Sequence, residues 1–263
     1  MLKLKKLEYG LVAAVLALLA VGIFGPFVGQ PAHQHDFADQ RSWGGIAFVM
    51  DVLSNMPFAL WGLIGLVCLS GLTRRSRRSW QGRLTALFFT GLVATAAASS
   101  WYHSQPDDVG LGIDRLGMVV AFAGLLGLAV AGRAGDRAGA AMALAVLLLG
   151  PLSIWCWLAS GQVLPWLLVQ FGGMVLVLWM AALKPLPGAL AVRWGWVIGI
   201  YSAAKLLELA DHSVYAWTAH SLSGHSLKHV VASFAAWPVV WALVRSQNPC
   251  RIHVANSDGS PAH

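Results

Sequence analysis

The sequence is poor in charged residues. Asp, Glu, Lys and Arg make up only 11% of its 263 residues, whereas soluble domains typically carry about 25%. Hydrophobic residues account for 57% of the chain, and no polar block is long enough to form a soluble domain. This shortage excludes a water-soluble globular protein and predicts a polytopic membrane protein.

Cysteine is also scarce. Cys68, Cys156 and Cys250 are far apart in the chain, and two of them lie within apolar runs. Their spacing excludes a disulfide framework and a thiolate metal site, so we expect them to pack as small hydrophobic residues.

What the sequence has instead is long apolar runs. About 20 apolar residues can cross a bilayer as a helix, which predicts an all-α membrane bundle with crossings at 8–28, 46–71, 81–103, 113–132, 138–159, 162–183, 194–217 and 222–245. The first run resembles a signal peptide in its basic start, but it is long and no small-x-small cleavage site follows it. We therefore interpret residues 1–30 as an anchor helix that is kept.

Basic residues predict the orientation of these crossings, because cytoplasmic loops accumulate Lys and Arg. If the N-terminus is cytoplasmic and the chain alternates, 14 of the 18 basic residues fall inside. Both termini are then cytoplasmic, and the net charge of +7 orients the protein rather than binding nucleic acid. The inside residues are Lys3, Lys5, Lys6, Arg74, Arg75, Arg77, Arg78, Arg83, Arg133, Arg137, Lys184, Arg193, Arg245 and Arg251.

Histidines and acids gather on the opposite, outer face. Ionisable residues within crossings are costly and indicate function by default. Three groups stand out at the outer ends of crossings: Ser99 and His103 followed by Asp114; the pair His225 and His229; and Asp51, Ser54 and Asn55 in the segment DVLSN.

The histidine pair has the spacing of a metal clamp. Residues four apart share one face of a helix, so His225 and His229 can bind one ion. His103 is the best candidate for a third imidazole, which would complete a three-histidine set with a fourth position open for water. Such a set suits zinc, which lowers the pKa of water toward about 7.

Plainer interpretations stand beside this one. The histidines can serve packing or interfacial solvation, Asp114 can cap a helix, and Ser99 can bond to its own helix backbone. Lys228 can extend its amine to lipid headgroups. Lys205, Glu208 and Asp211 have the spacing of a paired polar stripe, structural or supporting the site.

Together, these motifs resemble the alkaline ceramidases, which belong to a wider group of seven-helix membrane hydrolases that includes the adiponectin-receptor-like proteins. The resemblance rests on Ser99-x₃-His103, Asp114 eleven residues later, His225-x₃-His229, and DVLSN, and it covers roughly residues 36–245. It implies a seven-helix core preceded by one extra N-terminal transmembrane helix. The domains would be 1–30 (anchor helix), 31–246 (hydrolase) and 247–263 (disordered cytoplasmic tail).

The resemblance implies an amidohydrolase that cleaves a ceramide-like N-acyl lipid from the bilayer to a fatty acid and a sphingoid base. Zinc would be held by His103, His225 and His229. Asp114 would orient or deprotonate the attacking water, and Ser99 would hydrogen-bond the water or the developing oxyanion. The residues expected to support the site are Asp51, Ser54, Asn55, Glu208 and Asp211.

Some eukaryotic ceramidases also bind calcium in the segment before the first core crossing. Here that segment offers Asp36 and Asp39, but Phe48 stands where another acid would be expected, so the resemblance supports calcium only weakly.

Two rival functions remain from the sequence: a metal-binding receptor or sensor with little turnover, and a haem-binding membrane protein that uses two of the histidines. No protein partner is indicated. We expect a multi-pass membrane protein whose active site lies toward the outer face, which is periplasmic or lumenal. In a bacterium the membrane would be the plasma (inner) membrane.

Overall fold

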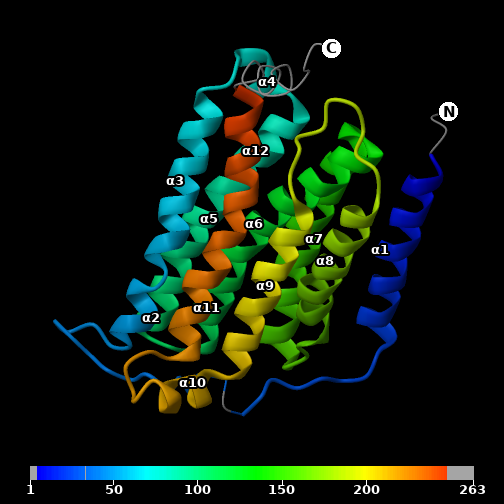
Figure 1. Ribbon diagram of the computed structural model, residues 1–263. Coiled ribbons are helices and arrows are strands. Elements are labelled where there is room, and N and C mark those ends of the chain that lie inside the picture. Colours follow the sequence, from blue (N-terminus) through cyan, green and yellow to red (C-terminus); the bar gives the residue numbers. More distant parts are fainter. Residues whose placement is uncertain (1–4, 33, 248–263) are drawn as a thin grey trace, which may run out of the picture.

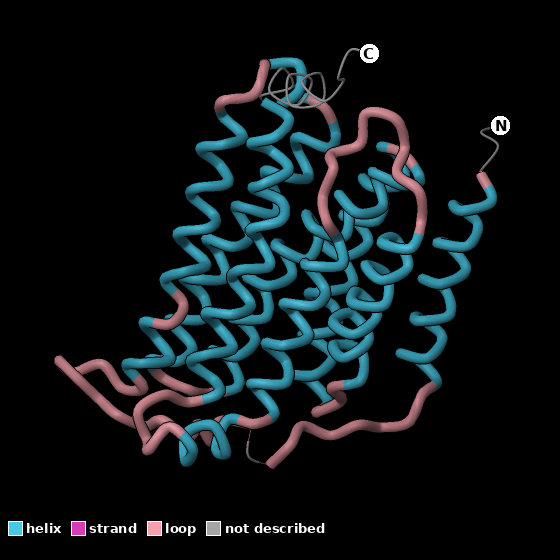
Figure 2. The backbone as a smooth tube through the Cα atoms, in the orientation of Figure 1, coloured by secondary structure: helices cyan, strands magenta, loops and turns pink. Residues whose placement is uncertain are grey.

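A computed structural model describes residues 5–32 and 34–247, and within these ranges the chain is helical apart from loops and two isolated β-bridges. The helices run antiparallel in one bundle (Figures 1 and 2). They are α1 (Lys6–Phe24), α2 (Val49–Leu53), α3 (Met56–Ser70), α4 (Arg74–Arg78), α5 (Trp80–Ser104), α6 (Asp108–Ala134), α7 (Asp136–Ser160), α8 (Leu164–Ala182), α9 (Trp194–Leu209), α10 (Asp211–Trp217), α11 (Gly224–Ser233), the 3₁₀ turn η1 (Phe234–Ala236) and α12 (Trp237–Gln247).

Seven helical segments among the described residues are long and apolar enough to cross a membrane, which is the design of an integral membrane protein. Two of them are composite: Val49–Ser70 joins α2 to α3, and Gly224–Gln247 joins α11, η1 and α12. The helix α1 lies at the edge of the bundle against α8 (Figure 1), where the ring of Trp179 lies next to Gly10. Most of its side chains face outward.

The predicted crossing at 194–217 is wrong in its second half. The helix α9 ends at Leu209 and α10 turns away from it across the end of the bundle (Figure 1). With 16 residues, α9 is about 24 Å long, shorter than the roughly 30 Å of a hydrocarbon core. The break has a tertiary cause: Gly224 packs directly on the backbone of Leu207 and Asp211, and this close approach requires a residue without a side chain.

The predicted crossing at 46–71 is interrupted at Ser54 and Asn55. Pro57 lies in the first turn of α3 and has no backbone N–H to continue the ladder. The Ser54 hydroxyl and the Asn55 side-chain amide both donate to the carbonyl of Asp51, at 2.9 Å each. The interruption thereby brings polar side chains of DVLSN into the bundle.

The helices α5 and α6 form the closest pair in the bundle. A side chain at Gly91 would meet the backbone of Ala121, and one at Gly124 would meet the backbone of Phe88, both at 2.2 Å. Small residues let membrane helices approach this closely. The contact fixes the positions of His103 at the end of α5 and of Asp114 in α6.

The start of α6 corrects one sequence interpretation. The helix begins at Asp108, and the Asp107 side chain caps it by accepting from the Gly110 N–H at 2.5 Å. Asp114 lies almost two turns inside the helix and therefore has no capping role.

The predicted C-terminal tail lies almost wholly outside the described ranges, which end before residues 248–263.

Candidate metal centre

Three buried histidines meet at the end of the bundle opposite α4. His103 comes from the last turn of α5, and His225 and His229 come from α11. Their exposed fractions are 1%, 8% and 6%, and the three ring centroids lie 4.8 to 5.0 Å apart. One ring nitrogen from each lies within 4.8 Å of the other two, so the group can hold a metal ion.

One pair of donor atoms has the separation expected in a tetrahedral metal site. The Nε2 atoms of His103 and His225 are 3.3 Å apart. Two nitrogens bound at about 2.0–2.1 Å in tetrahedral geometry are separated by about 3.3–3.4 Å. The other ring nitrogen of His103, Nδ1, is buried without a protein partner.

A hydrogen bond from Ser54 orients the third ring. Ser54 Oγ donates to the carbonyl of Asp51 and lies 2.8 Å from His229 Nδ1. Because the hydroxyl proton is already used, Ser54 accepts from His229, which must carry its own proton on Nδ1. The Nε2 atom of His229 then presents a lone pair, as a metal ligand requires.

A layer of buried polar side chains contacts the start of α11, next to the histidines. Ser226 donates to Asp51 Oδ1 at 2.6 Å, and Ser223 caps α11 by accepting from the Ser226 N–H at 2.9 Å. Asp51 and Asn55 are fully buried, and each keeps one side-chain oxygen without a protein partner. DVLSN thus contacts the metal centre through Ser54 and α11 through Asp51.

Asp211 connects three segments of the chain around the site. Its carboxylate accepts from the His225 N–H at 2.8 Å and from the Ala38 N–H at 3.0 Å. It therefore fixes the first turn of α11 and also the loop that precedes α2. The sequence grouped Asp211 with Lys205 and Glu208 in one helical stripe, but the structure places it at the start of α10, apart from them.

Residues 35–41 of this loop cover the outer side of the histidines. The Phe37 ring, 4% exposed, packs edge-on at centroid distances of 4.8 Å from His103 and 4.5 Å from His225. His35 holds one end of the segment through Nδ1, 2.8 Å from Tyr102 Oη, and Arg41 holds the other by donating to the Ser221 carbonyl at 2.9 Å. Nothing in the composition of HDFADQR predicted this cover.

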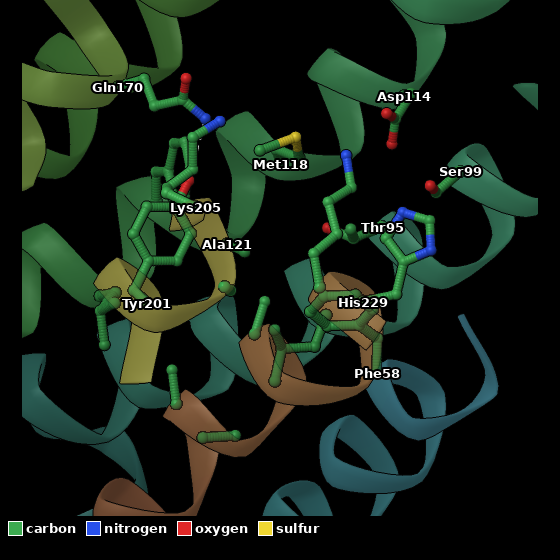
Figure 3. A pocket seen from close by; sticks show the side chains of 18 of the residues that line it. Phe58, Thr95, Ser99, Asp114, Met118, Ala121, Gln170, Tyr201, Lys205 and His229 are labelled. Atoms are coloured by element: carbon green, nitrogen blue, oxygen red, sulfur yellow. Dashed lines mark hydrogen bonds between the residues drawn. The ribbon is translucent and has the colours of Figure 1, made fainter. Parts of the chain in front are cut away.

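On the inner side the site opens into a cavity of about 120 Å³. Asp114, Ser99 and His229 line one end of it (Figure 3). Aromatic and aliphatic side chains line most of the remainder: Phe58, Phe88, Leu92, Met118, Ala121, Phe122, Leu125, Ala204, Ala232, Ala235 and Ala236. The predicted acid and hydroxyl thus share a cavity with a predicted ligand.

Two lysines also face this cavity. Lys228 Nζ donates to Glu208 Oε1 at 2.6 Å, and Lys205 pairs with the other oxygen of the same carboxylate. The suggestion that Lys228 reaches toward lipid headgroups is therefore wrong, because its amine points into the bundle. Glu208 joins α9 to α11 beside the metal centre.

The two acids considered for calcium lie apart from any metal-binding group. Arg41 takes both carboxylate oxygens of Asp39, at 2.8 and 2.5 Å. Burial raises the pKa of the Asp39 carboxyl, but the hydrogen bonds and charge of Arg41 outweigh this and lower it overall. Asp36 is half exposed and lies 3.8 Å from His212. In the described ranges, the three histidines are the one cluster with metal-ligand spacing, so the calcium suggestion gains no support.

No protein-family model matches the chain, and no curated protein has a detectably similar sequence. The resemblance to alkaline ceramidases stays a prediction from the motifs.

Proposed function

We propose that the protein is a zinc-dependent intramembrane hydrolase that cleaves the amide bond of a ceramide-like N-acyl lipid to a fatty acid and an amine. The observation that carries the proposal is the meeting of three buried histidines with Asp114 and Ser99 at one end of a largely apolar cavity. A metal centre, an acid–base group and a lipid-lined space are what this reaction needs.

His103, His225 and His229 would hold the zinc. Bound there, zinc would polarise the amide carbonyl and make water acidic enough to attack near neutral pH. Asp114 would accept the proton of the attacking water and pass it to the leaving nitrogen. Ser99 would hydrogen-bond Asp114, or the carbonyl oxygen as negative charge develops on it.

The rest of the site would bind and orient the lipid. The acyl chain would occupy the apolar cavity, where its burial provides binding energy. Phe37 and the segment around it would exclude bulk water from the outer side, so attack would depend on water admitted to the cavity. We place the substrate's entry in the bilayer because Phe37, in the loop before α2, already covers His103 and His225.

The proposed topology has eight crossings, with both termini cytoplasmic and the metal centre toward the outer face. The ends of α1 and α12 that carry the chain termini lie at the same end of the bundle as the basic helix α4 (Figure 1). This arrangement supports the positive-inside orientation. It requires α9 to cross despite its length, and α1 to be an anchor helix added to a seven-helix core.

The haem alternative loses support from the histidine geometry. The rings pack edge-to-face against one another, and two of their nitrogens are 3.3 Å apart. A porphyrin held by two axial histidines needs a gap between the rings for its macrocycle and iron. These rings leave no such gap.

The test is elemental analysis of the purified protein, paired with hydrolysis of a lipid extract read by mass spectrometry. We expect one zinc per chain and the release of fatty acid and sphingoid base, lost on chelation and restored by zinc. A zinc-loaded protein that hydrolyses no N-acyl lipid would instead support the receptor or sensor alternative. A protein without metal would reject both.

A further inference from the structure

A second apolar cavity adjoins the cavity beside the histidines. A second cavity of about 50 Å³ lies beyond the first, and the two share five wall residues. The shared residues are Phe122, Leu125, Gln170, Tyr201 and Ala235. Residues that line both cavities lie where the two adjoin, and we call these five residues the partition.

The second cavity lies deeper in the bundle than the first. Beyond the shared residues it is lined by side chains of α6, α8 and α9: Leu126, Val169, Gly173, Met174, Val177, Val197 and Ile198. Along α9, Tyr201 is seven residues from Glu208, which is about 10 Å of helix. The partition therefore lies about 10 Å further from the metal centre than Glu208.

A hydrogen-bonded pair crosses this partition. Gln170 Nε2 of α8 donates to Tyr201 Oη of α9 at 2.9 Å (Figure 3), and Gln170 is 8% exposed. Phe122 packs edge-on against the Tyr201 ring at 6.1 Å and stacks on Trp166 at 6.5 Å. The hydrogen-bonded pair therefore joins α8 to α9, and α6 contacts it through Phe122.

We propose that Gln170 and Tyr201 set the length of acyl chain that the site accepts, by closing the first cavity off from the second. The inference rests on the proposed function in taking the ligand to be an N-acyl lipid. A chain that ends before the partition leaves the pair intact. A longer chain must separate it and leave an amide and a hydroxyl without partners in apolar surroundings, which is unfavourable.

Two substitutions act on the partition in opposite directions. Tyr201→Ala removes the ring and the hydrogen-bond acceptor and joins the cavities, so the preferred chain becomes longer. Ala235→Leu adds bulk to the shared wall, so the preferred chain becomes shorter. Each methylene that gains burial strengthens binding about fourfold; two of them favour the longer chain about fifteenfold in Tyr201→Ala relative to the wild type.

Val177→Ala is the matched control, because Val177 lines the second cavity alone. It leaves the chain-length preference unchanged in the wild-type background, where the partition is closed. Combined with Tyr201→Ala, it extends the preference further. This dependence on background distinguishes a partition from general loosening of the bundle.

The experiment measures both turnover and binding of a homologous series of N-acyl sphingoid lipids that differ only in acyl length. Turnover is read by mass spectrometry of the released acids, and binding by native mass spectrometry of the detergent-solubilised full chain. Opposite shifts in Tyr201→Ala and Ala235→Leu are the expected result. If Tyr201→Ala does not fold, Ala235→Leu and Gln170→Ala carry the test.

Unchanged chain-length profiles in folded variants would overturn the partition while leaving the hydrolase proposal intact. Conversely, shifted binding profiles without any hydrolysis would support the partition and reject the hydrolase. If no N-acyl lipid binds at any length, the partition proposal fails as well.

Discussion

The two ends of the helical bundle use charge in opposite ways. At one end, α4 exposes four arginines to solvent, and the Arg77 guanidinium donates to the Ser70 carbonyl. At the other end many polar side chains turn inward, and the buried ones include Asp39, Asp51, Asn55, Ser99, His103, Arg115, Asp211, Ser223, His225, Ser226 and His229.

The difference separates orientation from chemistry. Exposed charges in water interact weakly with the fold, so the arginines of α4 can orient the chain without shaping its interior. Buried polar groups are costly unless they have partners, so their hydrogen bonds at the histidine end fix specific positions. Four predictions test this contrast, from the largest expected effect to the smallest.

Removing a ligand is expected to have the largest effect. His229→Ala should reduce the zinc content to near zero and the rate of hydrolysis by more than about 100-fold. Mutating a residue that only hydrogen-bonds a metal ligand already lowers metal affinity or activity by about 10–100-fold, and loss of the ligand itself should cost more. Zinc is measured by elemental analysis and turnover by fatty-acid release. His212→Ala, at an exposed histidine of the same end, is the control and should retain both. Full activity of His229→Ala without bound metal would show that hydrolysis does not depend on the histidine cluster.

Asp114→Asn should separate chemistry from metal binding. The amide cannot accept the proton of the attacking water, so we expect turnover to fall by about 10²–10⁴-fold. Zinc content should stay at the wild-type level, since Asp114 is outside the histidine set. Pre-steady-state release of the fatty acid measures the chemical step. An unchanged rate would exclude Asp114 as the proton acceptor.

Ser54→Ala should weaken the metal centre without abolishing it. His229 Nδ1 then loses its acceptor, and losing such a partner typically costs 10–100-fold in metal affinity or activity. Competition with a zinc chelator measures the affinity. Ser70→Ala is the matched control, because the Ser70 hydroxyl donates to the Val67 carbonyl of its own helix, α3. Equal zinc affinity in the two variants would show that Ser54 does not orient the ring.

The smallest effect is expected at the basic end. Replacing all four arginines of α4 by Gln should leave zinc content and turnover unchanged, and each replacement should change stability by less than about 0.5 kcal/mol, as at most exposed sites. The replaced residues are Arg74, Arg75, Arg77 and Arg78. Cysteine-accessibility labelling should nevertheless detect a fraction of reversed molecules, because the basic bias has been reduced. A loss of zinc in this variant would show that the arginines of α4 influence the histidine cluster at the opposite end of the bundle.

Local patterns in the sequence predicted much of the helical architecture. The runs at 81–103, 138–159 and 162–183 match α5, α7 and α8 to within three residues at each end. The run at 194–217 did not, because the break after Leu209 depends on Gly224 packing against the turn from another part of the chain. Hydrophobicity alone carries no information about such a contact.

The candidate site likewise has residues that the sequence predicted and residues that it did not. The spacing of His225 and His229 placed them on one face of a helix, and the structure brings His103 to them. No role was predicted for Ser223 and Ser226, although two serines three apart at the start of an apolar helix indicate a cap. For Phe37 no sequence signal existed.

The sequence by itself determined that the chain forms apolar helices and that two histidines share one helical face, because both properties depend on neighbours a few residues apart. Only the tertiary structure decided that Ser54 bonds His229 across 175 residues, that Lys228 turns inward to Glu208, and that Gln170 meets Tyr201 between two cavities. These contacts depend on how closely the helices approach and rotate against one another. That is set by packing across the whole bundle rather than by any one segment.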